Sequence, residues 1–517
     1  MAGSSRSSLP RLLPPLQIIV TAALAVWVLG LLRPIGVEGQ WQWQVFDHPI
    51  PPLGLVAVLA AILLTLLLAH ALSERAAEAE GGSRAAKALG AGWRLVLVLG
   101  AFSWTIGLYN LVPGAWYHLT AASLSDVSNE YFVDAYRIND PVRYCRQYGS
   151  HQAESGHHIA THPPGAVLTY YGIIEFYRST GLSRQAQGMA EWLHGEDAGA
   201  VMDTVDRIPT ARRIPSDQVA LPALVALTFG LLGVLCILPA AACGRLLWGE
   251  RAAFPAAALA ATVPGLALFF QSLDAPVALV AMVAIWAAAR SVVGPRPWLG
   301  ALGTGVILGV GIFITFGLLA AAAVCGIIFL GGCHAGGCES ARSRYGWLQR
   351  PVAMVAGILA VWAPACALLG LDPVAMMARG AESHAGVIET FDRAYGTWVW
   401  MNLVEYTAFL GPALLLLTLG ALPLARRTGG LPGLFTLAVL GTLVLVDASG
   451  SVRAEVGRIW VFFMPLMAVI AAGLCTPATD RPEDSKAPGA LLGWTVLCQV
   501  AALVMLAISV HPSVRAF

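Results

Sequence analysis

The sequence predicts an all-α fold, a polytopic bundle of transmembrane helices. Of the 517 residues, 57% are hydrophobic and only 12% are charged, and the mean hydropathy is +0.70. Soluble globular domains carry roughly 25% charged residues. Apolar runs recur along most of the chain, and a helix crosses a bilayer with roughly 20 such residues. The composition therefore excludes a soluble globular protein. A formal charge of +1 without a clustered basic face argues against a nucleic-acid partner.

About thirteen segments are apolar and long enough to span, counting shorter ones that pack inside a bundle. The first is expected to remain as an anchor, because no small-residue cleavage site follows it. The run from Trp298 to Leu330 is too long for one helix and is divided at Thr315 to Gly317. The predicted spans are 15–32, 51–72, 93–112, 217–240, 252–270, 274–290, 298–314, 316–331, 351–370, 399–424, 431–447, 459–475 and 488–510.

The charged residues between these spans predict the orientation of the protein. If the N-terminus is cytoplasmic, the arginine-rich connections also lie on the cytoplasmic side, as the positive-inside bias requires. Three acid-rich loops, 113–216, 371–398 and 447–458, then face outward from the cell membrane. Residues 166–177 are apolar but too short to span, so we expect an interfacial or re-entrant helix there. The arginine-rich connections contain Arg75, Arg84, Lys87, Arg245, Arg251, Arg290, Arg296, Arg342, Arg344, Arg350, Arg426 and Arg427.

These features divide the chain into three parts. Residues 1–92 hold two N-terminal spans, and residues 93–475 form a transmembrane core with the three outer loops. Residues 476–517 contain a cytoplasmic linker and the last span.

The polar segment 119–164 interrupts the apolar chain and contains the first candidate site. Asp126 and Glu130 are four residues apart, so on a short helix both carboxylates would lie on one face. Such a carboxylate could deprotonate a hydroxyl or hold a divalent cation against a phosphate. Alternatively, Asp126 caps a helix that begins at Val127, and Glu130 interacts with the helix dipole. The spacing leaves both interpretations open.

Three further groups of residues could bind an anion or a second substrate. His162 precedes two prolines that stiffen the start of a helix, whose free amides could meet a phosphate. Arg453, Glu455 and Arg458 lie at the mouth of the span that begins at Ile459, where arginine offers several donors to a phosphate. The alternative is that both arginines reach toward the membrane surface and pair with Glu455. In loop 371–398, Arg379 and His384 are candidates for acceptor contacts, and so is Tyr131 beside Glu130. No metal site with convincing ligand spacing is present in the sequence.

Three motifs in this order resemble the C-type (GT-C) glycosyltransferase superfamily of membrane enzymes. This group includes polyprenyl-phosphate-dependent mannosyltransferases and aminoarabinose transferases. The first motif is Ser125-Asp126-Val127 followed by Glu130-Tyr131 and Ala135. The second is Thr161-His162-Pro163-Pro164-Gly165, and the third is Arg213-Ile214-Pro215. The position of Arg453 to Arg458 is similar to that of an arginine directed at the lipid phosphate. The resemblance is best over residues 93–300.

The resemblance implies an inverting glycosyltransferase with Asp126 as the base and a polyprenyl-phosphate sugar as the donor. The acceptor would be a glycan, a lipid or a protein outside the cytoplasm. Many members have adjacent acids where this chain has Asp126 and Val127, so either Asp126 or Glu130 could be the base. The resemblance implies no definite cofactor, and a divalent cation remains possible. Two alternatives are a non-enzymatic lipid or polysaccharide transporter and an enzyme similar to O-antigen ligases. Acids near the bilayer midplane and repeated halves would favour the transporter.

Overall fold

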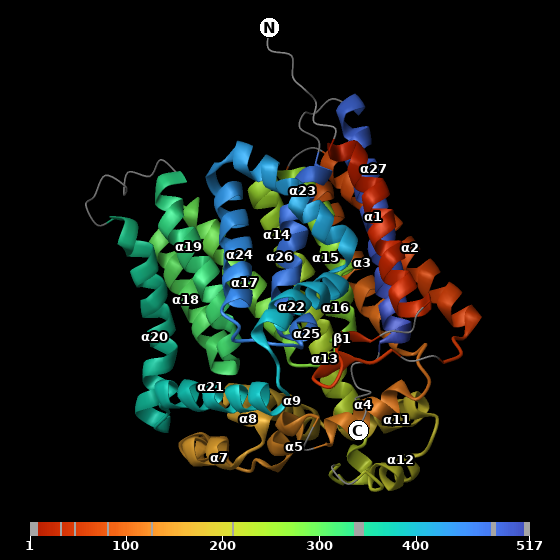
Figure 1. Ribbon diagram of the computed structural model, residues 1–517, viewed down its shortest axis with the longest axis vertical. Coiled ribbons are helices and arrows are strands. Elements are labelled where there is room, and N and C mark those ends of the chain that lie inside the picture. Colours follow the sequence, from red (N-terminus) through yellow and green to blue (C-terminus); the bar gives the residue numbers. More distant parts are fainter. Residues whose placement is uncertain are drawn as a thin grey trace.

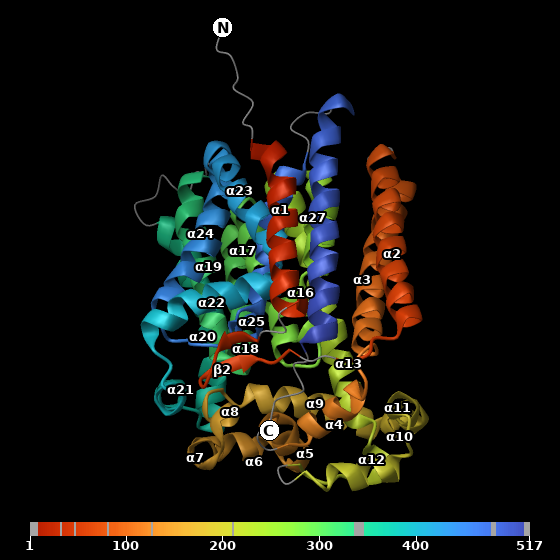
Figure 2. The ribbon, with the colours of Figure 1, turned by 45° about the vertical axis from the view of Figure 1, so that its right-hand side comes forward.

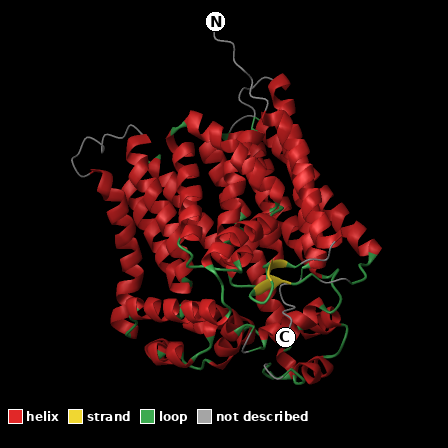
Figure 3. Ribbon diagram, viewed as in Figure 1, coloured by secondary structure: helices red, strands yellow, loops and turns green. Residues whose placement is uncertain are grey.

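The protein is almost entirely helical, as Figure 3 shows, and this confirms the predicted all-α membrane bundle. The computed structural model describes residues 9–30, 34–45, 48–79, 82–125, 128–208, 211–335, 346–476 and 482–510. Long helices form the bundle, and a layer of short helices covers one of its ends (Figure 1).

Each predicted span coincides with helical structure, but not every one is a long unbroken helix. Within the described ranges, nine helices are long and apolar enough to cross a membrane. Two of them combine several elements: α1 (Leu9–Ala25) continues into the short π-helix η1 (Val26–Gly30), and η2 (Ser216–Gln218), α13 (Leu221–Val234) and α14 (Ile237–Trp248) form one span. The other seven are α2 (Pro52–Glu78), α3 (Arg84–Tyr109), α17 (Asp274–Val292), α18 (Pro297–Ile314), α20 (Gln349–Leu369), α24 (Gly430–Ala448) and α27 (Pro482–Ser509).

The remaining predicted spans are short or broken, so the expected number of about thirteen is too high for unbroken helices. Segment 252–270 divides into α15 (Ala253–Ala261) and α16 (Pro264–Leu268), because Val263 is extended before a proline. Segment 399–424 is a pair, α22 (Tyr395–Leu410) and α23 (Pro412–Thr428), bent by 104°. Segments 316–331 and 459–475 are shorter apolar helices built from η4 (Phe316–Leu318), α19 (Leu319–Ala335), η7 (Val461–Phe463), α26 (Met464–Ala472) and η8 (Gly473–Cys475).

The bend between α22 and α23 lies at Gly411, whose φ of 90° suits glycine alone. A helix break inside a membrane leaves backbone carbonyls that only neighbouring side chains can satisfy. Gln499 Nε2 on α27 donates to the Leu410 carbonyl at 2.9 Å. Gln17 Nε2 on α1 donates to the Ala413 carbonyl at 3.2 Å. The first and last helices of the bundle therefore stabilise the bend.

Replacing Gln499 by leucine should destabilise the protein by about 1–3 kcal/mol, because the Leu410 carbonyl would lose its buried donor. Thermal unfolding in nanodiscs measures this loss. Leu497→Ala on the same helix is the control, since Leu497 is 58% exposed to the surroundings of the bundle. Equal melting temperatures for Gln499→Leu and the parent protein would contradict the role given to this contact.

The layer at one end of the bundle combines the first two predicted outer loops. Helix α9 (Gly165–Ser179) has 15 residues and belongs to this layer, in agreement with the prediction that residues 166–177 are too short to span the membrane. Helix α21 (Pro373–Thr390) runs across the end of the bundle (Figure 1). The other helices of the layer are α4 (Ala115–Ser123), α5 (Glu130–Arg137), α6 (Pro141–Arg146), α7 (Tyr148–Glu154), α8 (His157–Ala160), α10 (Leu182–Gln185), α11 (Gln187–His194) and α12 (Ala198–Val205).

The C-terminal end of α2 and the N-terminal end of α3 lie at the opposite end of the bundle from this layer (Figure 2). Loops predicted to face outward and a basic connection predicted to face the cytoplasm are thus separated by the bundle. Which end faces the cytoplasm stays a prediction.

A short β-hairpin between α1 and α2 was not expected from the sequence. Strands β1 (Ile35–Val37) and β2 (Trp41–Trp43) pair antiparallel, with Ile35 opposite Trp43. Two hydrogen bonds fix the hairpin to α22. Trp43 Nε1 donates to Glu405 Oε1 at 2.7 Å, and Trp398 Nε1 donates to Gln40 Oε1 at 2.6 Å. The alternation of glutamine and tryptophan over residues 40–44 is the period-two pattern of a strand.

Candidate functional site

A cavity of about 780 Å³ lies where the helical bundle meets the layer of short helices. Segments from the hairpin, from α17 and from all three predicted outer loops contribute to its wall. Six of the nine candidate residues named from the sequence line it: Glu130, Tyr131, His162, His384, Glu455 and Arg458. The structure therefore brings together residues from three distant parts of the chain.

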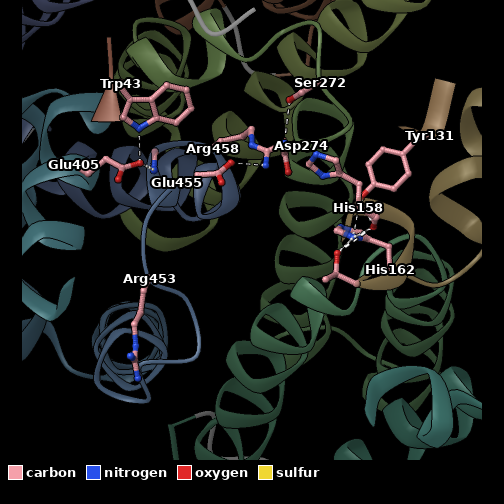
Figure 4. Close-up of polar contacts among 12 residues, drawn as sticks. Trp43, Tyr131, His158, His162, Ser272, Asp274, Glu405, Arg453, Glu455 and Arg458 are labelled. Atoms are coloured by element: carbon pink, nitrogen blue, oxygen red, sulfur yellow. Dashed lines mark hydrogen bonds and ion pairs between the residues drawn. The ribbon is translucent and has the colours of Figure 1, made fainter. Parts of the chain in front are cut away.

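Arg458 lies between two carboxylates in this cavity (Figure 4). Its Nη2 is 2.9 Å from Glu455 Oε2, and its Nη1 is 3.6 Å from Asp274 Oδ2. Burial lowers the pKa of Arg458, but the two carboxylates raise it more, so the net shift is upward. The guanidinium therefore stays charged. Its Nε has no hydrogen-bond partner within the described residues and remains able to donate.

An unusual turn before α25 (Val456–Ile459) sets the direction of Glu455. Ala454 and Glu455 have φ values of 87° and 60°. Such left-handed conformations in residues other than glycine cost about 1–3 kcal/mol each and persist only when the surroundings enforce them. Asn402 on α22 provides this support. Its Oδ1 accepts from the Ala454 amide at 3.2 Å, and its Nδ2 donates to the Val452 carbonyl at 2.9 Å.

Asp274, whose side chain is 26% exposed, and Glu405, which is fully buried, are two acids that were not among the candidates named from the sequence. Asp274 is the first residue of α17, and its Oδ2 accepts from Ser272 Oγ at 3.1 Å. Glu405 lies inside α22, and its Oε1 accepts from the Gly457 amide at 2.8 Å as well as from Trp43. Each lies within a predicted span, and this position could have identified it from the sequence. An ionisable side chain inside a membrane is energetically unfavourable and usually has a function.

Tyr131, His162 and Thr161 form a hydrogen-bonded group on another side of the cavity (Figure 4). Tyr131 Oη is 2.8 Å from His162 Nδ1 and also donates to the His158 carbonyl at 3.0 Å. Thr161 Oγ1 is 3.0 Å from the same His162 nitrogen. These contacts hold the His162 ring at the cavity wall.

Glu130 lines the cavity, but both of its carboxylate oxygens bond backbone amides. Oε1 accepts from Gly156 N at 2.6 Å, and Oε2 accepts from Ile159 N at 3.1 Å. Burial raises the pKa of Glu130, and these two amides act in the opposite direction. Glu130 therefore anchors the turn that leads into α8.

Replacing Glu130 by glutamine should mainly weaken this anchor, because an amide offers one acceptor oxygen where the carboxylate offers two. We expect faster amide hydrogen exchange over residues 156–160. Asp140→Asn is a control, since Asp140 likewise caps a short helix through the Val142 and Arg143 amides but does not line the cavity. Unchanged exchange over residues 156–160 would contradict the anchoring role of Glu130.

Two of the predicted arginines do not line the cavity. Arg453 donates to the Gly450 and Arg393 carbonyls at 3.1 and 2.6 Å, and Figure 4 shows its side chain directed away from Arg458. Arg379 on α21 donates to the Gly149 carbonyl at 2.9 Å and so joins α21 to α7. Arg393, which follows α21 in the same predicted outer loop as Arg379, lines the cavity instead.

Asp126, the predicted base, lies outside the described residues. Ser123 and Ser128, which flank it in the sequence, both line the cavity. In the described part of the chain, no group of three or more histidine, cysteine, aspartate or glutamate side chains could hold a metal ion. The base and a divalent cation both stay predictions.

Comparisons with known proteins place the chain near no characterised family by sequence. No family model matches it, and no curated protein does. Among solved structures, it is similar to the Archaeoglobus fulgidus oligosaccharyltransferase complex with zinc and sulfate, with a TM-score of 0.32 and 13% sequence identity. The match covers 72% of this chain and 49% of that one. The chain therefore spans about half the length of that enzyme.

Proposed function

We propose that the protein is a membrane glycosyltransferase of the C type. It transfers a sugar from a polyprenyl-phosphate donor to a glycan, lipid or protein acceptor outside the cytoplasm. The observation that carries the proposal is the position of the Arg458 guanidinium, flanked by Asp274 and Glu455, in a large cavity at one end of a transmembrane bundle. A lipid-linked phosphate can reach such a cavity from the bilayer while its sugar meets a water-soluble group.

The proposed reaction inverts the anomeric carbon of the sugar. The base, assigned to Asp126, removes the proton from an acceptor hydroxyl as its oxygen attacks the anomeric carbon. The bond from that carbon to the phosphate oxygen breaks, and the lipid phosphate leaves with the electron pair. Arg458 stabilises this phosphate through charge-assisted hydrogen bonds. Glu455 orients Arg458, and the Tyr131–His162 pair contributes polar contacts to the bound substrates.

The distribution of polar groups favours this enzyme over a transporter. Discontinuous transmembrane helices often form transporter sites, and the α22–α23 pair is discontinuous. However, the Gln499 side chain satisfies the Leu410 carbonyl at this bend, and Gly411 does not line the cavity. The polar side chains converge instead on the end of the bundle that carries the predicted outer loops.

The test is to incubate the purified protein in nanodiscs with radiolabelled polyprenyl-phosphate sugars and to measure release of the lipid phosphate. Reconstituted vesicles with the same lipids then report any movement of label across the bilayer. We expect label to leave the lipid, with transfer to water if no acceptor is added. If label crosses the bilayer while remaining on the lipid for every sugar tried, the protein is a transporter and the proposal fails.

A further inference from the structure

We propose that Arg393 forms a second anion-binding subsite in this cavity, which binds a negatively charged group on the acceptor. The acceptor would then be a sugar that carries a phosphate or a carboxylate. This inference rests on the proposed function, because it assigns the acceptor of that reaction.

Arg393 is a buried cation that faces the cavity without a paired acid. Its side chain lines the cavity although the residue is only 4% exposed. Nη1 donates to the Arg453 carbonyl at 2.7 Å, while Nε is buried with no hydrogen-bond partner in the described segments. Burial lowers the pKa of Arg393. The charges of Glu455 and Glu405 oppose this shift, although neither carboxylate forms an ion pair with Arg393. A buried charge with only a neutral acceptor is costly unless a ligand compensates it.

Arg458 differs from Arg393 in this respect. Two carboxylates already surround Arg458, at 2.9 and 3.6 Å. A donor with a single phosphate needs one cation to stabilise the negative charge of the departing lipid phosphate. Arg393 lies on a different loop and has no paired carboxylate among the described residues. We therefore assign it to a second anion rather than to the donor phosphate.

The surroundings of Arg393 form a rigid wall suited to a sugar ring with a charged substituent. The Arg393 guanidinium carbon is 5.4 Å from the Phe391 ring centroid and 5.8 Å from that of Trp41. Trp41 packs edge-on against Trp43, with 5.6 Å between the ring centroids. Trp43 is fixed in turn by its hydrogen bond to Glu405. These rings offer an apolar face beside a cation, a combination that excludes water and strengthens a charged hydrogen bond.

Two further contacts prepare this wall before any ligand binds. Arg393 donates to the carbonyl of Arg453, and Arg453 donates back to the carbonyl of Arg393 at 2.6 Å. This reciprocal pair joins loop 371–398 to loop 447–458. His384 on α21 lines the same cavity, and burial lowers the pKa of its ring, which bonds the Ser451 backbone and adds a neutral polar group to this wall rather than a second cation. A site prepared in this way loses little conformational freedom on binding.

The experiment measures binding of glucose 1-phosphate, glucuronate and glucose to the full-length protein in phosphatidylcholine nanodiscs by calorimetry. Charge-assisted hydrogen bonds predict that at least one anionic probe binds roughly 10- to 100-fold more tightly than glucose. Arg393→Gln should remove this preference, and Arg393→Lys should restore part of it because lysine lacks the planar fork. Arg379→Gln is the matched control, since Arg379 also donates to a backbone carbonyl but does not line the cavity.

Several outcomes would overturn the inference. One is equal affinity for all three probes in the parent protein, and another is an anion preference that survives Arg393→Gln. If Arg393→Gln leaves probe binding intact but abolishes donor hydrolysis by water, Arg393 serves the donor, as expected for a diphosphate. If added phosphatidylglycerol displaces the probes, the subsite belongs to a lipid headgroup.

Folding and the proposed function are tested separately from this inference. Thermal unfolding shows whether Arg393→Gln is folded. If it is not, Arg393→Lys replaces it, because lysine keeps a positive charge but lacks the planar fork, and an anion preference equal to that of the parent protein would then overturn the inference. Failure of the parent protein to consume any donor would refute the proposed function, whereas loss of the anion preference alone refutes only the subsite.

Discussion

Asp126→Asn should reduce sugar transfer by about 10²–10⁴-fold, because a general base contributes roughly that factor and asparagine cannot accept the proton. The release of lipid phosphate from a radiolabelled donor measures the effect. Thermal stability should change little if Asp126 acts only in the reaction. The residue lies outside the described part of the structure, so this expectation depends on the sequence motif and on the flanking serines at the cavity wall.

Glu130→Gln separates the two acids that the motif left open. Glu130 holds two backbone amides at 2.6 and 3.1 Å. We therefore expect its replacement to loosen the turn before α8 and to leave most of the turnover. Retained activity in Asp126→Asn, with loss in Glu130→Gln, would reverse the assignment. Full activity in both variants would remove the enzymatic interpretation of this loop.

Arg458→Ala should have the second large effect, on donor binding and on stability together. Arg458 is 22% exposed and pairs with both Glu455 and Asp274. Its removal leaves two carboxylates without a cation, a loss that costs about 3–5 kcal/mol in fully buried pairs and less here, because the Glu455 and Asp274 side chains are 16% and 26% exposed. The apparent KM for the donor should also rise, and Arg458→Lys should recover only part of the loss.

A compensating variant distinguishes these two effects. Combining Arg458→Ala with Asp274→Asn removes one of the unpaired acids and should restore part of the lost melting temperature. The donor KM should remain high, because the phosphate still lacks its arginine. Recovery of normal donor affinity in the double variant would show that Arg458 acts only as a partner of the two acids.

Hydropathy predicted the helices well, because a transmembrane segment must be apolar over most of its length. It failed where a few residues break a helix. Gly411 and the step from Val263 to Pro264 lie within apolar runs, and a sum over about twenty residues does not detect them. The hairpin at residues 35–43 was missed for a related reason, since strands of three residues carry too little pattern between two long spans.

The site was predicted only in part, because backbone geometry decides which side chains converge. Arg453 and Arg458 are five residues apart in the sequence, and both were expected to bind the phosphate. The left-handed conformations of Ala454 and Glu455 reverse the local direction of the chain, so the two arginines diverge. Asp274 could not be matched to Arg458 from the sequence, because the two residues are 184 positions apart and several helices lie between them.

The contact between the two ends of the chain bears on how the protein is made. Helices α1 and α27 lie side by side in Figures 1 and 2, joined by the Gln17–Thr495 hydrogen bond of 2.9 Å. Val45, just after the tryptophan hairpin, forms a β-bridge with Val510, just after α27. Ribosomal synthesis delivers the hairpin early and α27 hundreds of residues later. We therefore expect nascent chains that lack α27 to insert into the membrane with the tryptophan hairpin of the cavity wall not yet fixed through Val45, and the site to mature only after α27 has been released.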